Sequence, residues 1–194
     1  MPAWHTPRAG PTFRNRNPSP ISDAMDVLLI RHGKAAERDP NRWPDDDKRP
    51  LTADGAAEMR DVCTGMLKLG VEFEYLVTSP LVRARQTADI LAEAFEWKEP
   101  PQVAEVLGDN CTAPRVLQLL AKYPPDARVA LVGHEPAFSR VAAELIGRSG
   151  DAALELKKGG VVTISFEGPA ALGLGSLGSL LKPSQLRKAG KSRR

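Results

Sequence analysis

The chain has 194 residues and a formal net charge of +3, enough for one domain with a proper core and flanking tails. No apolar run approaches the roughly 20 residues of a membrane span, so we expect a soluble protein without a membrane partner. The charge divides into +2 in residues 1–24, −5 in 25–167 and +6 in 168–194. Because the net positive charge lies outside the expected folded part, nucleic acid is not an expected partner.

The two ends of the chain are expected to flank a single domain at residues 25–167. Residues 1–24 are rich in Pro, Arg and Asn with little to bury, which predicts a disordered extension. Met25 offers an alternative start. Residues 168–194 alternate Gly, Leu and Ser before a basic end, which predicts a tail with room for a short docking helix. Two cysteines fit reduced thiols in the cytoplasm better than a disulfide framework.

The first buried strand is predicted at residues 27–30, an apolar run that ends in Arg31, His32 and Gly33. Strands buried on both faces belong to parallel α/β sheets, whose ligands bind just beyond the carboxyl ends of the strands. Arg31 and His32 should therefore lie at that edge. A cation beside a neutral imidazole suits an anionic electrophile, of which phosphate is the obvious example.

The polar stretch that follows, residues 34–50, contains three consecutive aspartates at 45–47. Three carboxylates in a row raise the possibility of a metal site. No histidine lies nearby, and Lys48 and Arg49 follow directly, so we interpret the stretch as a solvated loop.

Strands and helices then alternate along the chain. Thr52 is suited to cap a helix that extends to about Leu69. Three further strands are predicted at residues 74–78, 101–106 and 127–132, and each is followed by a helix, at 81–95, 112–122 and 137–146 respectively. Two short strands, 153–156 and 161–166, are expected to pair through Gly159-Gly160 at the sheet edge. This order predicts an α/β fold, a three-layer α/β/α sandwich with a mostly parallel sheet.

Two further side chains are expected at the same edge of the sheet. His134 stands just past the strand at 127–132, and Pro136 is suited to begin the next helix. Arg83 lies in the first turn of the helix after the second strand, where backbone amides and the helix dipole favour an anion. A cation in that turn opposes the dipole, so a bound anion would resolve the conflict.

These motifs resemble those of the histidine phosphatase superfamily, the group that includes the phosphoglycerate mutases. Arg31-His32-Gly33 is similar to its opening motif. The string from Thr78 to Thr87 resembles its second signature, and Gly133-His134-Glu135-Pro136 resembles the segment with its second active-site histidine. The stretch Arg49-Pro50-Leu51-Thr52, followed by Gly55, resembles the SixA branch, the protein phosphohistidine phosphatases. The resemblance implies a phosphoglycerate mutase-like fold.

The resemblance also implies a hydrolase that needs no metal and no cofactor. His32 would be the nucleophile, becoming a phosphohistidine that water then cleaves. Arg31, Arg83 and His134 would bind the phosphate oxygens and neutralise the charge that develops on them. Family members generally use an acid near the end of the third strand as proton donor, and Glu105 and Asp109 are both candidates.

The expected substrate is phosphohistidine on a protein. Lys34-Ala35-Ala36-Glu37 stands where the mutases carry a serine and an asparagine, and the domain lacks their long insertions. Two alternatives remain open: a small-molecule or broad-specificity phosphomonoesterase, and a non-catalytic module that binds phosphate or polyanions. The sequence also leaves the oligomeric state open.

Overall fold

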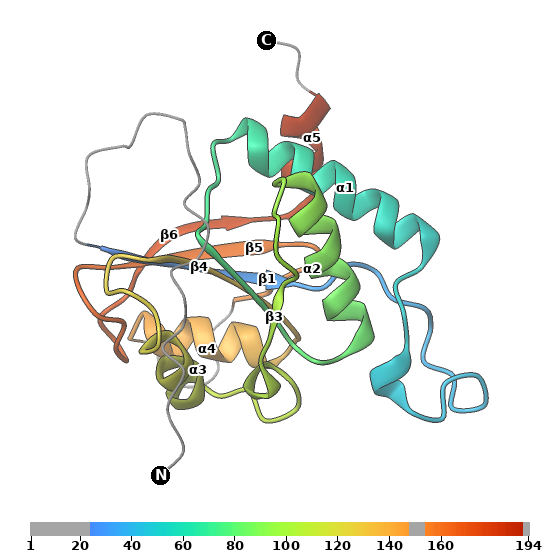
Figure 1. Ribbon diagram of the computed structural model, residues 1–194, viewed down its shortest axis with the longest axis horizontal. Coiled ribbons are helices and arrows are strands. Elements are labelled where there is room, and N and C mark those ends of the chain that lie inside the picture. Colours follow the sequence, from blue (N-terminus) through green and yellow to red (C-terminus); the bar gives the residue numbers. More distant parts are fainter. Residues whose placement is uncertain (1–23, 148–153, 192–194) are drawn as a thin grey trace.

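A six-stranded mixed sheet lies between two layers of helices (Figure 1). The computed structural model describes residues 24–147 and 154–191. The strands are β1 (Met25–Arg31), β2 (Tyr75–Thr78), β3 (Gln102–Val103), β4 (Arg128–Gly133), β5 (Val161–Phe166) and β6 (Ser176–Leu181). They are arranged in the order β3-β2-β4-β1-β5-β6, with β1 to β4 mutually parallel and β5 antiparallel to both neighbours. The predicted α/β/α sandwich with a mostly parallel sheet is confirmed.

The helices divide between the two faces of the sheet (Figure 1). One layer holds α1 (Ala53–Lys68), α2 (Val82–Ala94) and α5 (Pro183–Lys191), and the other holds α3 (Ala113–Leu120) and α4 (Ala137–Leu145). Two 3-10 turns, η1 (Asp46–Lys48) and η2 (Glu105–Leu107), lie in the connections. Thr52 caps α1 as predicted, since its hydroxyl accepts the amide N–H of Gly55 at 2.9 Å.

The apolar run of β1 is continuous because both faces of the strand are covered. Val27 and Leu29 pack into the core with α3 and α4, while Leu28 and Ile30 pack into the core with α1 and α2. All four side chains are at most 2% exposed. This burial on both sides places β1 in the middle of the sheet and fixes its carboxyl end, with Arg31 and His32, at the sheet's edge.

The C-terminal segment differs from the expected tail. Residues 176–181 form β6, which pairs with β5, and residues 183–191 form α5, which packs on α1. Leu186 is fully buried in the core shared with α1 and α2, and a Cβ on Gly65 of α1 would lie 1.9 Å from the Leu186 carbonyl oxygen. The apolar residues of this segment therefore complete the sheet and one helical layer. The expected extension 1–24 lies outside the described residues except for Ala24.

Two other predicted strands also differ from the structure. Residues 154–156 are not in a strand, and Ala153 lies outside the described residues. β5 pairs instead with β1 and β6, so it is an inner strand rather than half of a hairpin at the edge. The third strand is only Gln102–Val103, because the chain turns into η2 directly afterwards.

Both cysteines, Cys63 and Cys111, are buried and free. Burial raises the pKa of the Cys63 thiol to about 12 and that of Cys111 to about 11, so neither is a ready nucleophile at neutral pH. Within residues 24–147 and 154–191, no helix has the length and apolar character needed to cross a bilayer.

Candidate active site

Three parallel strands deliver polar side chains to one edge of the sheet. Arg31 pairs in register with Gly133, and Thr78 with Val132, so His32, His134 and Ser79 all follow strand ends at the same level. The ring centroids of His32 and His134 are 5.1 Å apart. Gly133 is needed at the end of β4 because a Cβ there would lie 2.4 Å from the Phe138 ring. The sheet thus sets two imidazoles side by side.

The His32 ring is held in one tautomer. Its Nδ1 lies 2.7 Å from the Gly33 carbonyl oxygen, and because a carbonyl only accepts, Nδ1 carries the proton and donates it. The lone pair is therefore on Nε2. The pKa of His32 is lowered to about 4, chiefly by burial; the Gly33 bond opposes this shift, and the cations Arg83 and Arg31 add to it. At neutral pH this imidazole is therefore uncharged, with an unprotonated Nε2.

His134 is also kept neutral. Its Nε2 lies 2.7 Å from the hydroxyl of Ser79, which also accepts the amide N–H of Leu81 at 3.3 Å. Burial, followed by the neighbouring His32, lowers the pKa of His134 to about 3. Its Nδ1 is buried and has no hydrogen-bond partner among the described residues. A polar group placed this way is ready to bond a ligand atom that enters the site.

Arg31 is anchored by the segment before β5. Its Nη1 donates to the Leu156 carbonyl at 2.8 Å, so residues 154–156, predicted as a strand, instead provide an acceptor for this guanidinium. The Gly159 amide donates to the carbonyls of Arg31 at 3.0 Å and His32 at 3.1 Å. Gly159 has φ +77°, a conformation that glycine adopts without strain. The turn at 159–160 thus supports the motif backbone.

Hydrogen bonds connect the segment that carries Arg83 directly to the turn after His32. Arg83 lies in the first turn of α2 and is 8% exposed, as the sequence predicts, while Arg85 is exposed. Thr87 is fully buried: its hydroxyl donates to the Arg83 carbonyl at 2.7 Å and accepts the Gly33 amide N–H at 3.0 Å. Thr87 thereby ties the turn after His32 to the helix that carries Arg83, a role the sequence interpretation missed.

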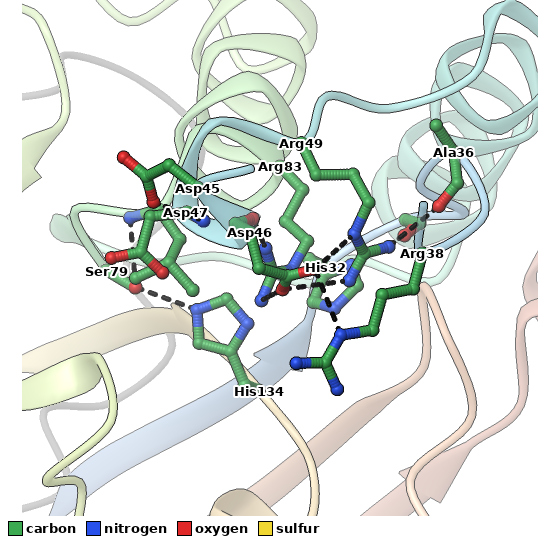
Figure 2. Close-up of polar contacts among 12 residues, drawn as sticks. His32, Ala36, Arg38, Asp45, Asp46, Asp47, Arg49, Ser79, Arg83 and His134 are labelled. Carbon is green, nitrogen blue, oxygen red and sulfur yellow. Dashed lines mark hydrogen bonds and ion pairs between the residues drawn. The ribbon is translucent and has the colours of Figure 1, made fainter. Parts of the chain in front are cut away.

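The loop of three aspartates contributes to the site, which corrects its interpretation as merely solvated. Arg83 donates from Nη1 to the Asp46 carbonyl at 2.8 Å, and its Nη2 lies 3.4 Å from the Asp46 carboxylate. The same carboxylate accepts bonds from Arg49 at 2.9 and 3.2 Å. Figure 2 shows Arg38, Arg49 and Arg83 gathered around Asp46. Arg49, in the Arg-Pro-Leu-Thr stretch, is therefore a further cation of the site.

The two candidate proton donors lie in a cavity of about 520 Å³ next to this cluster. Glu105 and Asp109 both line it and are both exposed, and Asp47 and Arg115 line it with them. The wall also includes Pro80 and Leu81, directly after the Ser79 that binds His134. Burial and the nearby carboxylates of Asp109 and Asp45 raise the pKa of Asp47. Asp47 is thus a third carboxyl group beside the site.

The predicted site residues fall into two groups. Arg31, His32, Arg83 and His134 meet at the edge formed by β1, β2 and β4, and Arg31, Arg83 and Arg49 are close enough to His134 to depress its pKa. Glu105 and Asp109 line the neighbouring cavity, and Asp109 is near enough to Arg83 to act on the pKa of its guanidinium. Two neutral imidazoles among several guanidinium groups form a cluster suited to a small polyanion with a reactive centre.

Comparison with known proteins identifies the family to which the chain belongs. The family model described as histidine phosphatase superfamily (branch 1) matches residues 27–112. An uncharacterized protein of Picosynechococcus is 39% identical over 141 residues, which cover 71% of this chain and 83% of that protein. Phosphohistidine phosphatase SixA of Escherichia coli K12 is 34% identical over 127 residues, covering 62% of this chain and 74% of SixA.

The fold agrees with a solved structure of the same group. A structure of the protein histidine phosphatase SixA complexed with tungstate superposes with a TM-score of 0.69 at 23% identity, covering 84% of this chain and 99% of that one. The chain belongs to branch 1 of the histidine phosphatase superfamily, and its relatives include the SixA phosphohistidine phosphatases.

Proposed function

We propose that the protein is a phosphatase that removes the phosphoryl group from phosphohistidine on another protein, through a phosphohistidine intermediate at His32. The observation that carries the proposal is the state of His32. Its Nδ1 bond to Gly33 leaves the Nε2 lone pair available, and its depressed pKa of about 4 keeps that lone pair unprotonated at neutral pH. A side chain in this state is a nucleophile that needs no separate base.

The reaction has two displacements at phosphorus. In the first, Nε2 of His32 forms a bond to phosphorus while the substrate's P–N bond breaks, and the substrate imidazole leaves with the bonding pair and takes up a proton. In the second, water attacks the same phosphorus, the P–Nε2 bond breaks, and inorganic phosphate and a proton are released. Arg31, Arg83 and His134 bind the non-bridging oxygens during both steps.

Two observations favour phosphohistidine as the substrate. SixA of E. coli, a phosphohistidine phosphatase, is 34% identical to this chain, and the SixA structure was complexed with tungstate, an oxyanion of phosphate-like geometry. An imidazole leaving group also demands little protonation. The carboxyl groups of Glu105 and Asp109 are exposed and make no hydrogen bond to either imidazole, which suits such a substrate.

A specific observation supports a second candidate, a small-molecule phosphomonoesterase. The cavity of about 520 Å³ beside Ser79-Pro80 is large enough for a small leaving group, and Glu105, Asp109 and Asp47 all line it. An alkoxide leaving group needs a proton donor, and a carboxyl group in this cavity would supply one.

The nucleophile is tested by the substitution His32→Ala. We expect loss of turnover, and we expect a phosphoenzyme trapped by quenching without acid to map to His32 in the parent protein. The matched control is His5→Ala, which removes a histidine outside all three motifs and should leave turnover unchanged. Normal turnover by His32→Ala would refute the mechanism.

The substrate class is tested by comparing kcat/KM for a phosphorylated histidine-containing carrier protein with that for an alkyl phosphate. We expect the parent to favour the P–N substrate. The double variant Glu105→Gln, Asp109→Asn should barely change P–N hydrolysis and should cut P–O hydrolysis sharply, and Asp47→Asn is measured beside it. A parent that prefers the alkyl phosphate, and loses both activities equally in the double variant, would be a general phosphomonoesterase.

A further inference from the structure

The carboxylate of Asp46 lies among the guanidinium groups of Arg38, Arg49 and Arg83 (Figure 2). The side chain of Asp46 accepts bonds from Nε and Nη2 of Arg49 at 2.9 and 3.2 Å, in the two-pronged geometry that arginine also uses for phosphate. It lies 3.4 Å from Nη2 of Arg83 and 3.8 Å from Nε of Arg38. The bond to Arg49 is the main reason that the pKa of Asp46 is lowered, so the group is ionised at neutral pH.

Asp46 contacts Arg83 in two separate ways. The backbone carbonyl of Asp46 accepts a bond from Nη1 at 2.8 Å, and this contact does not depend on the side chain. The carboxylate faces Nη2 as an ion pair. The carbonyl can therefore hold the guanidinium in position by itself, whereas the carboxylate adds a negative charge where an incoming phosphoryl group needs a positive one.

We propose that Asp46 sets the affinity of the site for phosphoryl anions, its carboxylate competing with bound phosphate for Arg83 and Arg49. In the absence of ligand the carboxylate neutralises part of the guanidinium charge. When a dianion binds, the two negative groups share the same donors and repel each other. The consequence is weaker binding of inorganic phosphate and faster release of this product, without loss of the arginine geometry.

The inference rests on the proposed function only for the place where phosphate binds. The size of the effect of Asp46 on phosphate affinity follows from Coulomb's law. A carboxylate about 6 Å from a bound dianion, at a dielectric constant close to that of water, weakens binding about tenfold. Removing the charge should therefore tighten phosphate binding about tenfold. Added salt should reduce the difference, because Asp46 is partly exposed and its field is screened.

The test is equilibrium binding of inorganic phosphate to the full-length protein by titration calorimetry. Asp46→Asn removes the charge and keeps the shape and the backbone carbonyl. The matched control is Asp45→Asn, which makes the same charge change one residue away, where the carboxylate pairs with Lys48 at 3.4 Å and caps the Asp47 amide. Asp46→Ala is a second variant in case the amide forms new bonds to the arginines.

We expect Asp46→Asn and Asp46→Ala to bind phosphate about tenfold more tightly than the parent, and Asp45→Asn to bind it as the parent does. In turnover assays the same two variants should show a lower inhibition constant for phosphate and a lower KM, with kcat unchanged or reduced by slow release. Phosphate binding that is unchanged or weaker in the Asp46 variants would overturn the proposal, as would equal tightening in Asp45→Asn.

Failure of this inference is distinguishable from failure of the proposed function. A parent protein that binds phosphate but hydrolyses neither substrate would refute the proposed function and leave the calorimetric comparison valid. A parent that turns over phosphohistidine while the Asp46 variants bind phosphate more weakly would refute the inference alone. Absence of phosphate binding in every variant would refute the inference too.

Discussion

The neutrality of His32 predicts activity at a pH where an ordinary histidine has ceased to act as a nucleophile. A histidine with its usual pKa of 6.5 is only about 3% neutral at pH 5. With the pKa lowered to about 4 by burial and by Arg83 and Arg31, about 90% of His32 remains neutral at the same pH. The neutral fraction of the histidine at pH 5 thus differs about thirtyfold between a pKa of 6.5 and a pKa of about 4, and a difference of this size is measurable.

The assay is the pH dependence of kcat/KM for an aryl phosphate between about pH 3.5 and 8, corrected for the second ionisation of the substrate. We expect the acid limb to fall near pH 4. An acid limb near 6.5 in a protein that is still folded would mean that the ring is more hydrated, or less close to the arginines, than the geometry implies, and would refute the reasoning.

Folding must be followed in the same experiment, because the depressed pKa values also affect stability. Both histidines have folded pKa values below the unfolded value of 6.5, so the unfolded state takes up protons first as the pH falls. Stability should be unaffected above about pH 6.5 and should decline below it, by about 2 kcal/mol per histidine at pH 5. Circular dichroism at each pH separates this loss from a loss of nucleophile.

Three substitutions test other parts of the structure. Arg83→Lys keeps the charge but loses the planar fork, and turnover should fall about tenfold to a thousandfold; parent-like turnover would place the arginine away from phosphate. Thr87→Val leaves the buried Gly33 amide without its acceptor, so urea denaturation should show a loss of about 1–3 kcal/mol, and turnover should fall as His32 loses support. Leu186→Ala should cost about 2–5 kcal/mol in the same assay, whereas an α5 that is only a tail would show no change.

The central residues of the site were predictable because short stretches of sequence around each of them indicate where a strand ends. Each of Arg31, His32 and His134 directly follows an apolar run, and a run of that kind predicts a buried strand and thus the position of its end. Arg83 was predictable for the same reason, since Ser79-Pro80 separates a strand from a helix. The rule that parallel strands end at one edge then brings these side chains together without any knowledge of tertiary contacts.

The parts that were missed depend on contacts between distant segments. Asp46 looks like a solvated residue in its own loop, and only its approach to Arg83 on α2 gives it a different role. Leu186 is the only large apolar residue of α5, so the pattern of this helix alone does not predict packing. One signal was available: Gly65 stands inside α1, where glycine is unfavourable, and an interior glycine indicates the close approach of another backbone.

The same cations explain both the reactivity of the nucleophile and the binding of the anion. Arg31 and Arg83 help to keep His32 and His134 unprotonated in the free protein, because a charged imidazole would be repelled by them. A phosphoryl dianion bound between these groups would offset much of the positive charge of the arginines. The dianion would raise the pKa of both imidazoles, and His134, whose buried Nδ1 lacks a partner among the described residues, would gain an oxygen to which it can donate. In the proposed mechanism His32 would escape protonation, because its Nε2 lone pair forms the bond to phosphorus. The arginines would then keep His32 uncharged before the substrate binds, and the bound substrate would favour the protonated form of His134 afterwards.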